Sequence, residues 1–333
     1  MPEVERVLLG VDIGGTKVAA GLVGSRGDIL FKSRTPMASQ GDAEAGLQAV
    51  IRAIDSLLAA KPARSASPSA IGISSPGPLD PKRGVVINPP NLPCWRNFPL
   101  AEKIQQAYQL PTRIDNDANA AGLAEAVWGA GAGHSSVFYA TLGTGIGTGI
   151  VVDGNIYHGR TGAAAEGGHL SIDYRGPRCA CGKRGCIEAL ASGPAVAQRA
   201  RAKLVHTGAE RSRILDLAGG NLDRITAEVV GEAYRAGDRL AADVLQETAD
   251  CLTIWLGNVI DLLEPDAIVF GGGLGELMAS WFDHIRSELP AWSINSRCQE
   301  IPLLRARYGE DSGIAGGAAL HLAPRLNASA RGR

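Results

Sequence analysis

The chain has 333 residues, enough for two compact lobes, and its hydrophobic content of 45% can fill ordinary cores. The formal net charge of −1 excludes an overall basic field for nucleic acid or anionic lipid, and 5% aromatic residues argue against a base-stacking platform. The start of the chain lacks a basic segment followed by an apolar one, and no apolar run reaches about 18 residues. We therefore expect a cytoplasmic protein without a membrane span.

Strand and helix signals alternate along the chain and predict an α/β fold. Strands are typically short apolar runs bounded by glycine or proline, and helices show apolar residues at a spacing of three and four. The predicted elements, in chain order, are strands at 7–13, 18–23 and 28–33, a helix at 42–60, a Pro/Ser/Ala loop at 61–69, strands at 70–74 and 113–115, a helix at 117–128, strands at 137–142 and 149–152, a helix at 238–263, a strand at 267–270, a helix at 312–322 and a frayed tail from 323.

The first glycine-rich turn, Asp12-Ile13-Gly14-Gly15-Thr16-Lys17, lies between two predicted strands. Glycines at such a turn let backbone N–H groups point at phosphate oxygens, and Asp12 is suited to hold Mg²⁺ directly or through water. The segment resembles a P-loop with its last two positions inverted. Because a P-loop opens a helix and this segment enters a strand, we reject that interpretation.

Two further segments of the chain are rich in glycine. Gly143-Thr144-Gly145-Ile146-Gly147 is suited to wrap the same triphosphate, and Gly271-Gly272-Gly273 at a strand end leaves room for adenine and ribose. Each segment alone is equally consistent with a tight hairpin turn. The run Ala140 to Gly145 also echoes the opening strand and turn, which predicts two related α/β lobes.

A polar corner follows the strand that ends at Asp115 and precedes a predicted helix. Asp117 could accept a proton from a sugar hydroxyl, and the Asn116 amide could bind a neighbouring hydroxyl. The alternative is plain helix capping by Asp115, Asn116 or Asp117. This segment by itself favours helix capping, and only the residues further along the chain reverse that interpretation.

One histidine and three cysteines form a cluster in the sequence: His169, Cys179, Cys181 and Cys186. Three thiolates and one imidazole make a closed tetrahedral set, which is typical of structural zinc. The alternatives are free buried thiols, a disulfide, or a zinc ribbon that binds nucleic acid. If one ring nitrogen of His169 binds zinc, the other is oriented toward a ligand hydroxyl, and Glu166 and Glu188 flank it as acceptors.

From about Val7 to His321 the chain resembles the ROK family (repressors, open reading frames and kinases) of bacterial sugar kinases. The matching stretches include the Asp12 turn, the corner at Asn116, and the segment from Leu142 to Gly147. They also include Pro76-Gly77-Pro78 with Asp80, and Pro90-Asn91-Leu92 with Trp95. The most specific stretch runs from Glu166 through His169 and the three cysteines to Glu188.

The resemblance implies a two-lobed actin/hexokinase-like (ribonuclease H-like) fold with a cleft between lobes, which we place at 1–116 plus 310–333 and at 117–309. It implies that Asp117 is the base for the C6 hydroxyl and that His169, Cys179, Cys181 and Cys186 bind zinc. The residues implied to line the sugar are Gly77, Asn91, Asn116, Asp117, Glu166, His169 and Glu188. Those implied to handle Mg²⁺ and ATP are Asp12, Gly14, Gly15, Thr16, Lys17, Thr141, Gly143, Thr144, Gly145, Gly271, Gly272 and Gly273.

The function expected from the residues and the resemblance together is ATP-dependent phosphorylation of a hexose, with glucose first. The alternatives are an N-acetylmannosamine or N-acetylglucosamine kinase and a sugar-responsive repressor. A repressor of this family carries a helix-turn-helix domain ahead of the first glycine turn, and here the first strand begins near Val7. We expect sugar and ATP as partners, no nucleic acid or membrane, and a homodimer or higher homo-oligomer.

Overall fold

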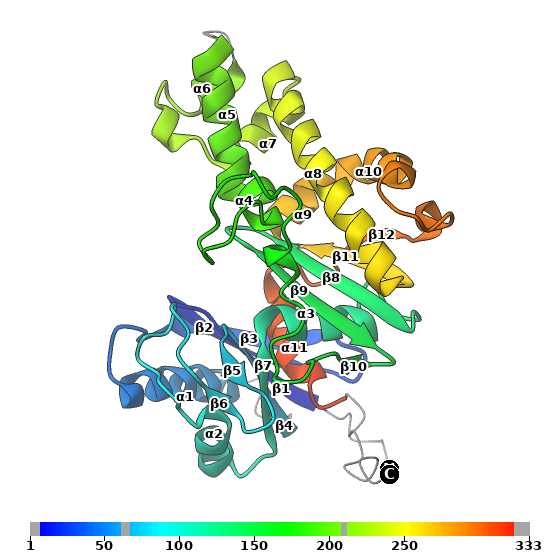
Figure 1. Ribbon diagram of the computed structural model, residues 1–333. Helices are drawn as coiled ribbons and strands as arrows, with labels where there is room; N and C mark the ends of the chain where they lie inside the picture. Colours follow the sequence, from blue (N-terminus) through cyan, green and yellow to red (C-terminus); the bar gives the residue numbers. More distant parts are fainter. Residues whose placement is uncertain (1–6, 61–66, 208–211, 323–333) are drawn as a thin grey trace. The chain divides into compact units, whose positions relative to one another are not determined.

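The computed structural model describes residues 7–60, 67–207 and 212–322 (Figure 1). The first part of the loop predicted at 61–69, the chain start and the tail predicted from 323 lie outside these ranges. Contacts divide the chain into two compact units. The first unit comprises Met1–Tyr139, Gly149–Ala165 and Arg307–Arg333, and the second comprises Ala140–Thr148 and Glu166–Ala306.

The first unit is built on a five-stranded sheet with the order β3-β2-β1-β4-β7. β1 pairs antiparallel with β2 and parallel with β4, and β4 pairs parallel with β7. The strands of this unit are β1 (Val7–Ile13), β2 (Lys17–Val23), β3 (Ile29–Pro36), β4 (Pro68–Ser75), β5 (Leu79–Asp80), β6 (Val85–Val86) and β7 (Thr112–Asn116). Its helices are α1 (Ala43–Ala59), α2 (Leu100–Tyr108), α3 (Asp117–Val127) and α11 (Ser312–Ala319).

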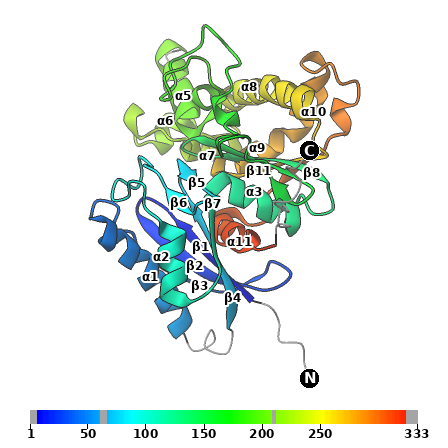
Figure 2. The ribbon, with the colours of Figure 1, turned by 60° about the horizontal axis from the view of Figure 1, so that its bottom comes forward.

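Helices cover both faces of this sheet, with α1 and α2 on one side and α11 with α3 on the other (Figure 2). The alternation of side chains along β1 explains the two layers: Leu9, Val11 and Ile13 belong to the core under α1, whereas Leu8 packs with residues of α11. The layer between the sheet and α11 is thin because the residues that form it are small. A Cβ on Gly10 would lie 1.9 Å from the Ile314 carbonyl oxygen, so α11 packs directly on the strand backbone.

The second sheet has the order β10-β9-β8-β11-β12. Within the second unit, α8 packs against four helices, α4, α5, α7 and α10, and its apolar stripe is buried. The strands of this sheet are β8 (Ser136–Leu142), β9 (Ile146–Val152), β10 (Asn155–Ile156), β11 (Ala267–Gly271) and β12 (Leu303–Arg305). Of these, β10 and parts of β8 and β9 belong to the first unit. The helices are α4 (Ile187–Ala191), α5 (Gly193–Thr207), α6 (Arg213–Leu217), α7 (Ala227–Arg235), α8 (Arg239–Leu263), α9 (Gly272–Met278) and α10 (Phe282–Glu288).

The two sheets share one topology, because each places its strands in the order third, second, first, fourth, fifth along the chain. This confirms the repeat that the second glycine segment predicts. The expected lobe boundary at 116 and 117 does not coincide with a boundary between the compact units, since α3 packs against α11 inside the first unit. The division into functional lobes therefore stays a prediction.

The other predicted elements are present with shifted ends. The predicted helix at 312–322 ends at Ala319, and the predicted strand at 149–152 begins at Ile146 instead. The structure also contains elements that are not predicted, namely the short strands β5, β6, β10 and β12 and the helices α2, α4 to α7, α9 and α10. Within the described ranges, no helix is both long and apolar enough to span a lipid bilayer.

Candidate functional site

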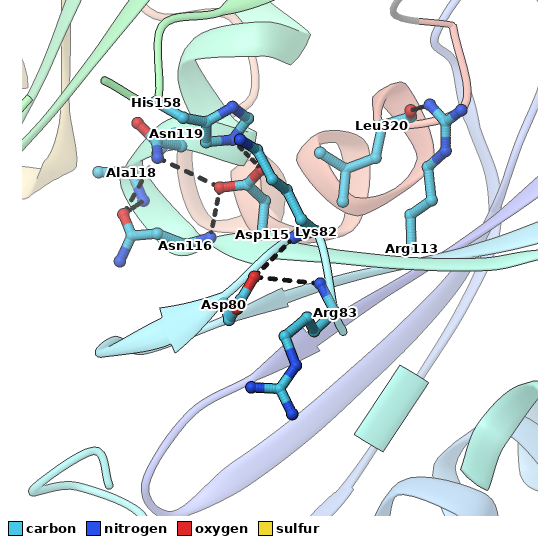
Figure 3. A network of polar contacts seen from close by, with 10 residues as sticks. All are labelled: Asp80, Lys82, Arg83, Arg113, Asp115, Asn116, Ala118, Asn119, His158 and Leu320. Carbon is cyan, nitrogen blue, oxygen red and sulfur yellow. Dashed lines mark hydrogen bonds and ion pairs between the residues drawn. The ribbon is translucent and has the colours of Figure 1, made fainter. Parts of the chain in front are cut away.

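The strand-to-helix corner at β7 and α3 carries Asn116 and Asp117, and Figure 3 shows Asn116 with the residues that surround it. Asn116 is the N-cap of α3, and its Oδ1 accepts hydrogen bonds from the backbone N–H groups of Ala118 at 3.0 Å and Asn119 at 3.4 Å. The cap uses the oxygen of the amide, so the Nδ2 group is the part of this side chain that can donate to a ligand. Capping and ligand binding are thus compatible roles of one residue.

Asp117 is the first residue of α3 and its side chain is exposed. Its Oδ1 accepts a hydrogen bond from the Ala118 N–H at 2.8 Å. A helix N-terminus favours a negatively charged carboxylate. The side chain is therefore held at the start of the helix and is accessible from solvent.

Asp12 lies at the end of β1, before the turn Gly14 to Thr16 that leads into β2. The hairpin confirms that no helix follows this turn and that it is not a P-loop. Burial, and next the charge of Asp117, raise the pKa of Asp12 to about 6. A Cβ on Gly313, in α11, would lie 2.2 Å from the Asp12 carboxyl group, so only glycine leaves room there.

Other predicted residues of the first unit gather around the same turn and corner. A Cβ on Gly15 would lie 3.1 Å from the Asn91 carbonyl oxygen, and one on Gly77 would lie 3.5 Å from Asn116 Nδ2. Lys17 begins β2, and its charge lowers the pKa of Asp12 against the larger effect of burial. The structure thus brings the residues expected at phosphate and at sugar next to each other within this unit.

The histidine–cysteine cluster forms in the second unit. The ligand atoms of His169, Cys179, Cys181 and Cys186 all lie within 4.8 Å of one another. His169 Nδ1 is 3.6 Å from Cys179 Sγ, and the Sγ atoms of Cys181 and Cys186 are 3.7 Å apart. With Zn–S bonds of about 2.3 Å and a Zn–N bond of about 2.0 Å, ligand atoms of a tetrahedral site lie about 3.5 to 3.8 Å apart. The four residues therefore fit a structural zinc ion.

The three thiols of the cluster differ in how readily they lose a proton. All six cysteines of the chain lie in the described ranges and are free thiols. Burial raises the pKa of Cys179 and raises that of Cys186 to about 12, whereas a backbone hydrogen bond from Lys183 lowers the pKa of Cys181. A bound divalent cation would displace the thiol protons and stabilise the thiolates.

Glu188 connects this cluster to the second glycine segment. Its Oε2 accepts a hydrogen bond from the Ile146 N–H at 3.0 Å, and its Oε1 lies 3.9 Å from His169 Nδ1. Because Nδ1 of His169 faces both Cys179 and Glu188, the Nε2 atom lies on the opposite side of the ring. Glu166 is exposed immediately before the 3₁₀ turn Gly167–His169.

The glycine segments of the second unit differ in part from the prediction. Ile146 and Gly147 belong to β9, so the turn itself contains Gly143, Thr144 and Gly145. The reason is that Ile146 pairs its backbone as a strand and packs its side chain in the interior. Gly271 ends β11, while Gly272 and Gly273 begin α9. Gly272 has a φ of +79°, and a Cβ there would lie 2.3 Å from the Leu142 carbonyl oxygen.

The contacts of Asp115 are not predicted by the sequence. This buried carboxylate lies beside the corner and pairs with His158, from the loop that follows β10 (Figure 3). The only signal in the sequence is the position of Asp115 directly before the helix cap. The partner is 43 residues away along the chain, so only folding brings the two together.

The sequence and the fold of this chain are similar to those of known proteins. The model of the ROK family matches residues 8–323. The chain belongs to the ROK family. A glucokinase from Thermotoga maritima is 34% identical over 323 residues, which cover 96% of this chain and 98% of the relative. A ROK family glucokinase from Streptomyces griseus, solved in complex with glucose and AMPPNP, has a TM-score of 0.78 and 35% identity over 94% of this chain and 98% of that one.

ROK relatives with other names are also similar to this chain. An N-acetylmannosamine kinase from Escherichia fergusonii is 32% identical over 94% of this chain and 97% of the relative. A xylose repressor from Caldicellulosiruptor bescii is 31% identical over 87% of this chain and 70% of the repressor. The family and the actin/hexokinase-like α/β fold expected from the motifs are confirmed.

Proposed function

We propose that this ROK protein is an ATP-dependent glucokinase that transfers the γ-phosphoryl group of ATP to the C6 hydroxyl of glucose. The observation that carries the proposal is Asp117, an exposed carboxylate at the start of α3 beside the Asn116 amide. A general base needs this exposure and a fixed position. The similarity to glucokinases over 94–98% of both chains supports the choice of reaction.

In this mechanism the first unit activates the acceptor. Asp117 accepts the proton of the attacking hydroxyl, and the Asn116 Nδ2 group, Gly77 and Asn91 orient the sugar. The helix cap holds Asn116 while it donates, because the oxygen of the amide stays on the helix. Phosphoryl transfer depends mainly on positioning and on neutralisation of charge, and a capped helix start supplies the positioning.

Nucleotide and Mg²⁺ are assigned to the glycine turns and to Asp12. The Asp12 carboxylate is partly buried and is repelled by Asp117, so a divalent cation beside it would relieve that repulsion. Mg²⁺ would supply neutralisation of phosphate charge. The turns at Gly14, Gly15 and Thr16 and at Thr141 to Gly145 offer backbone N–H groups, and Gly271 to Gly273 leave space for the nucleoside. Lys17 follows the first of these turns.

The second unit supplies further groups for the sugar. The Nδ1 atom of His169 faces the cysteines, and this contact orients the ring. The Nε2 atom, together with Glu166 and Glu188, is suited to bind sugar hydroxyls. Zinc on His169 and the three cysteines would fix this segment. We also expect the enzyme to act in the cytoplasm, in glycolysis, as a homodimer or higher homo-oligomer.

A second candidate is kinase activity on an N-acetylhexosamine. The relative from Escherichia fergusonii favours it, because its identity to this chain is only two percentage points below that of the Thermotoga glucokinase (34% against 32%). The two activities use the same chemistry at C6. They differ in the group that the site must accommodate at C2.

The experiment is a coupled assay of ADP release with Mg-ATP and a panel of sugars: glucose, fructose, mannose, allose, N-acetylglucosamine and N-acetylmannosamine. We expect the highest kcat/KM with glucose, and formation of glucose 6-phosphate that a dehydrogenase specific for this ester detects. Asp117→Asn should lower kcat by about 10² to 10⁴-fold, the range for removal of a general base. Glucose binding measured by calorimetry should survive in the variant.

Preference for an N-acetylhexosamine would replace the first candidate by the second. An Asp117→Asn variant that keeps substantial turnover would remove Asp117 as the base. A folded protein that turns over no sugar of the panel would contradict the kinase proposal for these substrates.

A further inference from the structure

Asp115 is the most buried carboxylate of the corner, with a side chain only 5% exposed. Its Oδ1 accepts hydrogen bonds from the Asn116 N–H at 2.8 Å and from Asn119 Nδ2 at 3.2 Å. Its Oδ2 lies 2.6 Å from His158 Nε2. Each carboxylate oxygen is therefore engaged, one by the start of α3 and one by His158 (Figure 3).

His158 belongs to a loop that folds back on itself in the first unit. The Ala164 N–H donates to the His158 carbonyl oxygen at 3.3 Å, and Gly159, with a φ of +66°, leaves room for Ala164. A Cβ on Gly162 would lie 3.5 Å from the Pro81 side chain. The loop from 158 to 164 thus lies beside the segment at Pro81, which follows Gly77 and β5.

The physical cost of losing this contact is high. A buried carboxylate without its hydrogen-bond or ion-pair partner loses solvation that nothing replaces. Asp115 would then move toward water. This movement alters its two other hydrogen bonds, which hold the backbone of Asn116 and the side chain of Asn119.

We propose that His158 is a positioning residue for the phosphoryl transfer described above: it anchors Asp115 and thereby fixes the Asn116–Asn119 segment that carries the base, and it ties the 158–164 loop to this corner. The role rests on the proposed function for its kinetic consequence. His158 acts through Asp115 and needs no contact with substrate.

The test compares His158→Ala, which removes the contact, with His158→Gln, whose Nε2 can still donate to Asp115. His206→Ala, an exposed histidine of α5 in the second unit, is the matched control. We expect His158→Ala to lower kcat/KM for glucose by about 10- to 100-fold, the scale of a catalytic group misplaced by about 1 Å. The KM for ATP should stay near the wild-type value, and His158→Gln should recover most of the loss.

A second measurement does not depend on activity. Arg160 is exposed in the same loop, so trypsin reports how firmly the loop is held. Cleavage after Arg160 should be faster in His158→Ala than in the wild type, and His158→Gln and His206→Ala should match the wild type. If His158→Ala keeps wild-type kinetics and wild-type cleavage, or if His158→Gln loses as much as His158→Ala, the positioning role is wrong.

The two proposals fail in different ways. Wild-type protein that turns over no sugar contradicts the proposed function, and the rate of cleavage after Arg160 still decides whether His158 holds the loop. Active wild-type protein whose kinetics and cleavage are unaffected by His158→Ala contradicts only the positioning role.

Discussion

At the scale of single residues, the first unit places two carboxylates, Asp12 and Asp117, within electrostatic reach of each other. Their surroundings differ. Asp12 is partly buried at a strand end, whereas Asp117 is exposed at a helix N-terminus, where negative charge is favoured. This difference agrees with the proposed roles, in which Asp12 binds Mg²⁺ and Asp117 accepts the proton of the sugar hydroxyl.

This difference gives a pH dependence. The pKa of Asp12 is about 6 in the folded protein, and an unfolded aspartate titrates near about 3.9. Between these values the folded state binds more protons, so its stability falls as pH rises and the loss is complete above about pH 6. The Asp12→Asn substitution removes the titrating carboxyl group and with it this loss of stability. In thermal unfolding without Mg²⁺, we expect the variant to gain stability over the wild type from pH 4.5 to pH 7.5, by at most roughly 2 to 3 kcal/mol.

The second-largest cause of the raised pKa, the charge of Asp117, supplies the control. In an Asp117→Asn background the gain from Asp12→Asn should shrink. A gain that is the same at both pH values would contradict the burial and repulsion argued for Asp12. In the active enzyme, the KM for Mg-ATP should rise as pH falls below about 6, because protons then compete with Mg²⁺ for Asp12.

At the scale of an element, the start of α3 combines stability and binding in one amide. Asn116 caps the helix with Oδ1 and offers Nδ2 to the proposed sugar. The opening of the helix is also held from behind by Asp115. The helix itself is short and rich in alanine and glycine, so it packs closely against the equally small residues of α11.

Substitution separates the two roles of Asn116. Asn116→Ala removes both, and loss of an N-cap typically costs about 1 kcal/mol. Asn116→Ser keeps an oxygen that can cap the helix but lacks the amide donor. We expect urea unfolding to show a loss of stability in the alanine variant and little change in the serine variant, while both variants raise the KM for glucose. An Asn116→Ser variant with the wild-type KM for glucose would show that Nδ2 of Asn116 does not bind the sugar.

At the scale of the whole molecule, the two sheets have the same strand order. In each sheet the first strand is followed by a glycine turn. A duplicated unit explains why the glycine turns that we propose to bind phosphate occur twice along one chain. The second unit adds the cluster of His169 and three cysteines, which has no counterpart among the described residues of the first unit. This cluster lies in a segment with little regular structure, where the proposed metal would contribute folding free energy that packing does not supply.

Loss of the metal should therefore act on stability as well as activity. Cys181→Ser should abolish stoichiometric zinc in metal analysis, lower the temperature of thermal unfolding and raise the KM for glucose. Cys251→Ser, in α8 away from the cluster in sequence, should keep the zinc and the wild-type transition. Native protein that contains no zinc would contradict the structural-metal proposal, whatever the behaviour of the variants.

Local patterns in the sequence determined a large part of this description. Apolar periodicity, glycine turns and capping residues act within a few positions, so they predict β1, α1, α3, α8 and the hairpin at Asp12 without knowledge of the fold. The cysteine spacing likewise indicates the metal cluster, since its ligands lie within one short segment. Short edge strands such as β6 and β12 carry too few residues to show a period, and the sequence does not predict them.

Only the tertiary structure decided which distant residues meet. The pairing of Asp115 with His158, the approach of Gly313 to Asp12 and the hydrogen bond from Ile146 to Glu188 join segments separated by 40 residues or more. No local preference encodes such contacts, because they follow from the order of strands in a sheet and from the close packing of glycine-rich surfaces. The motifs of this chain therefore indicate its chemistry, and the folded contacts determine how firmly each group is held.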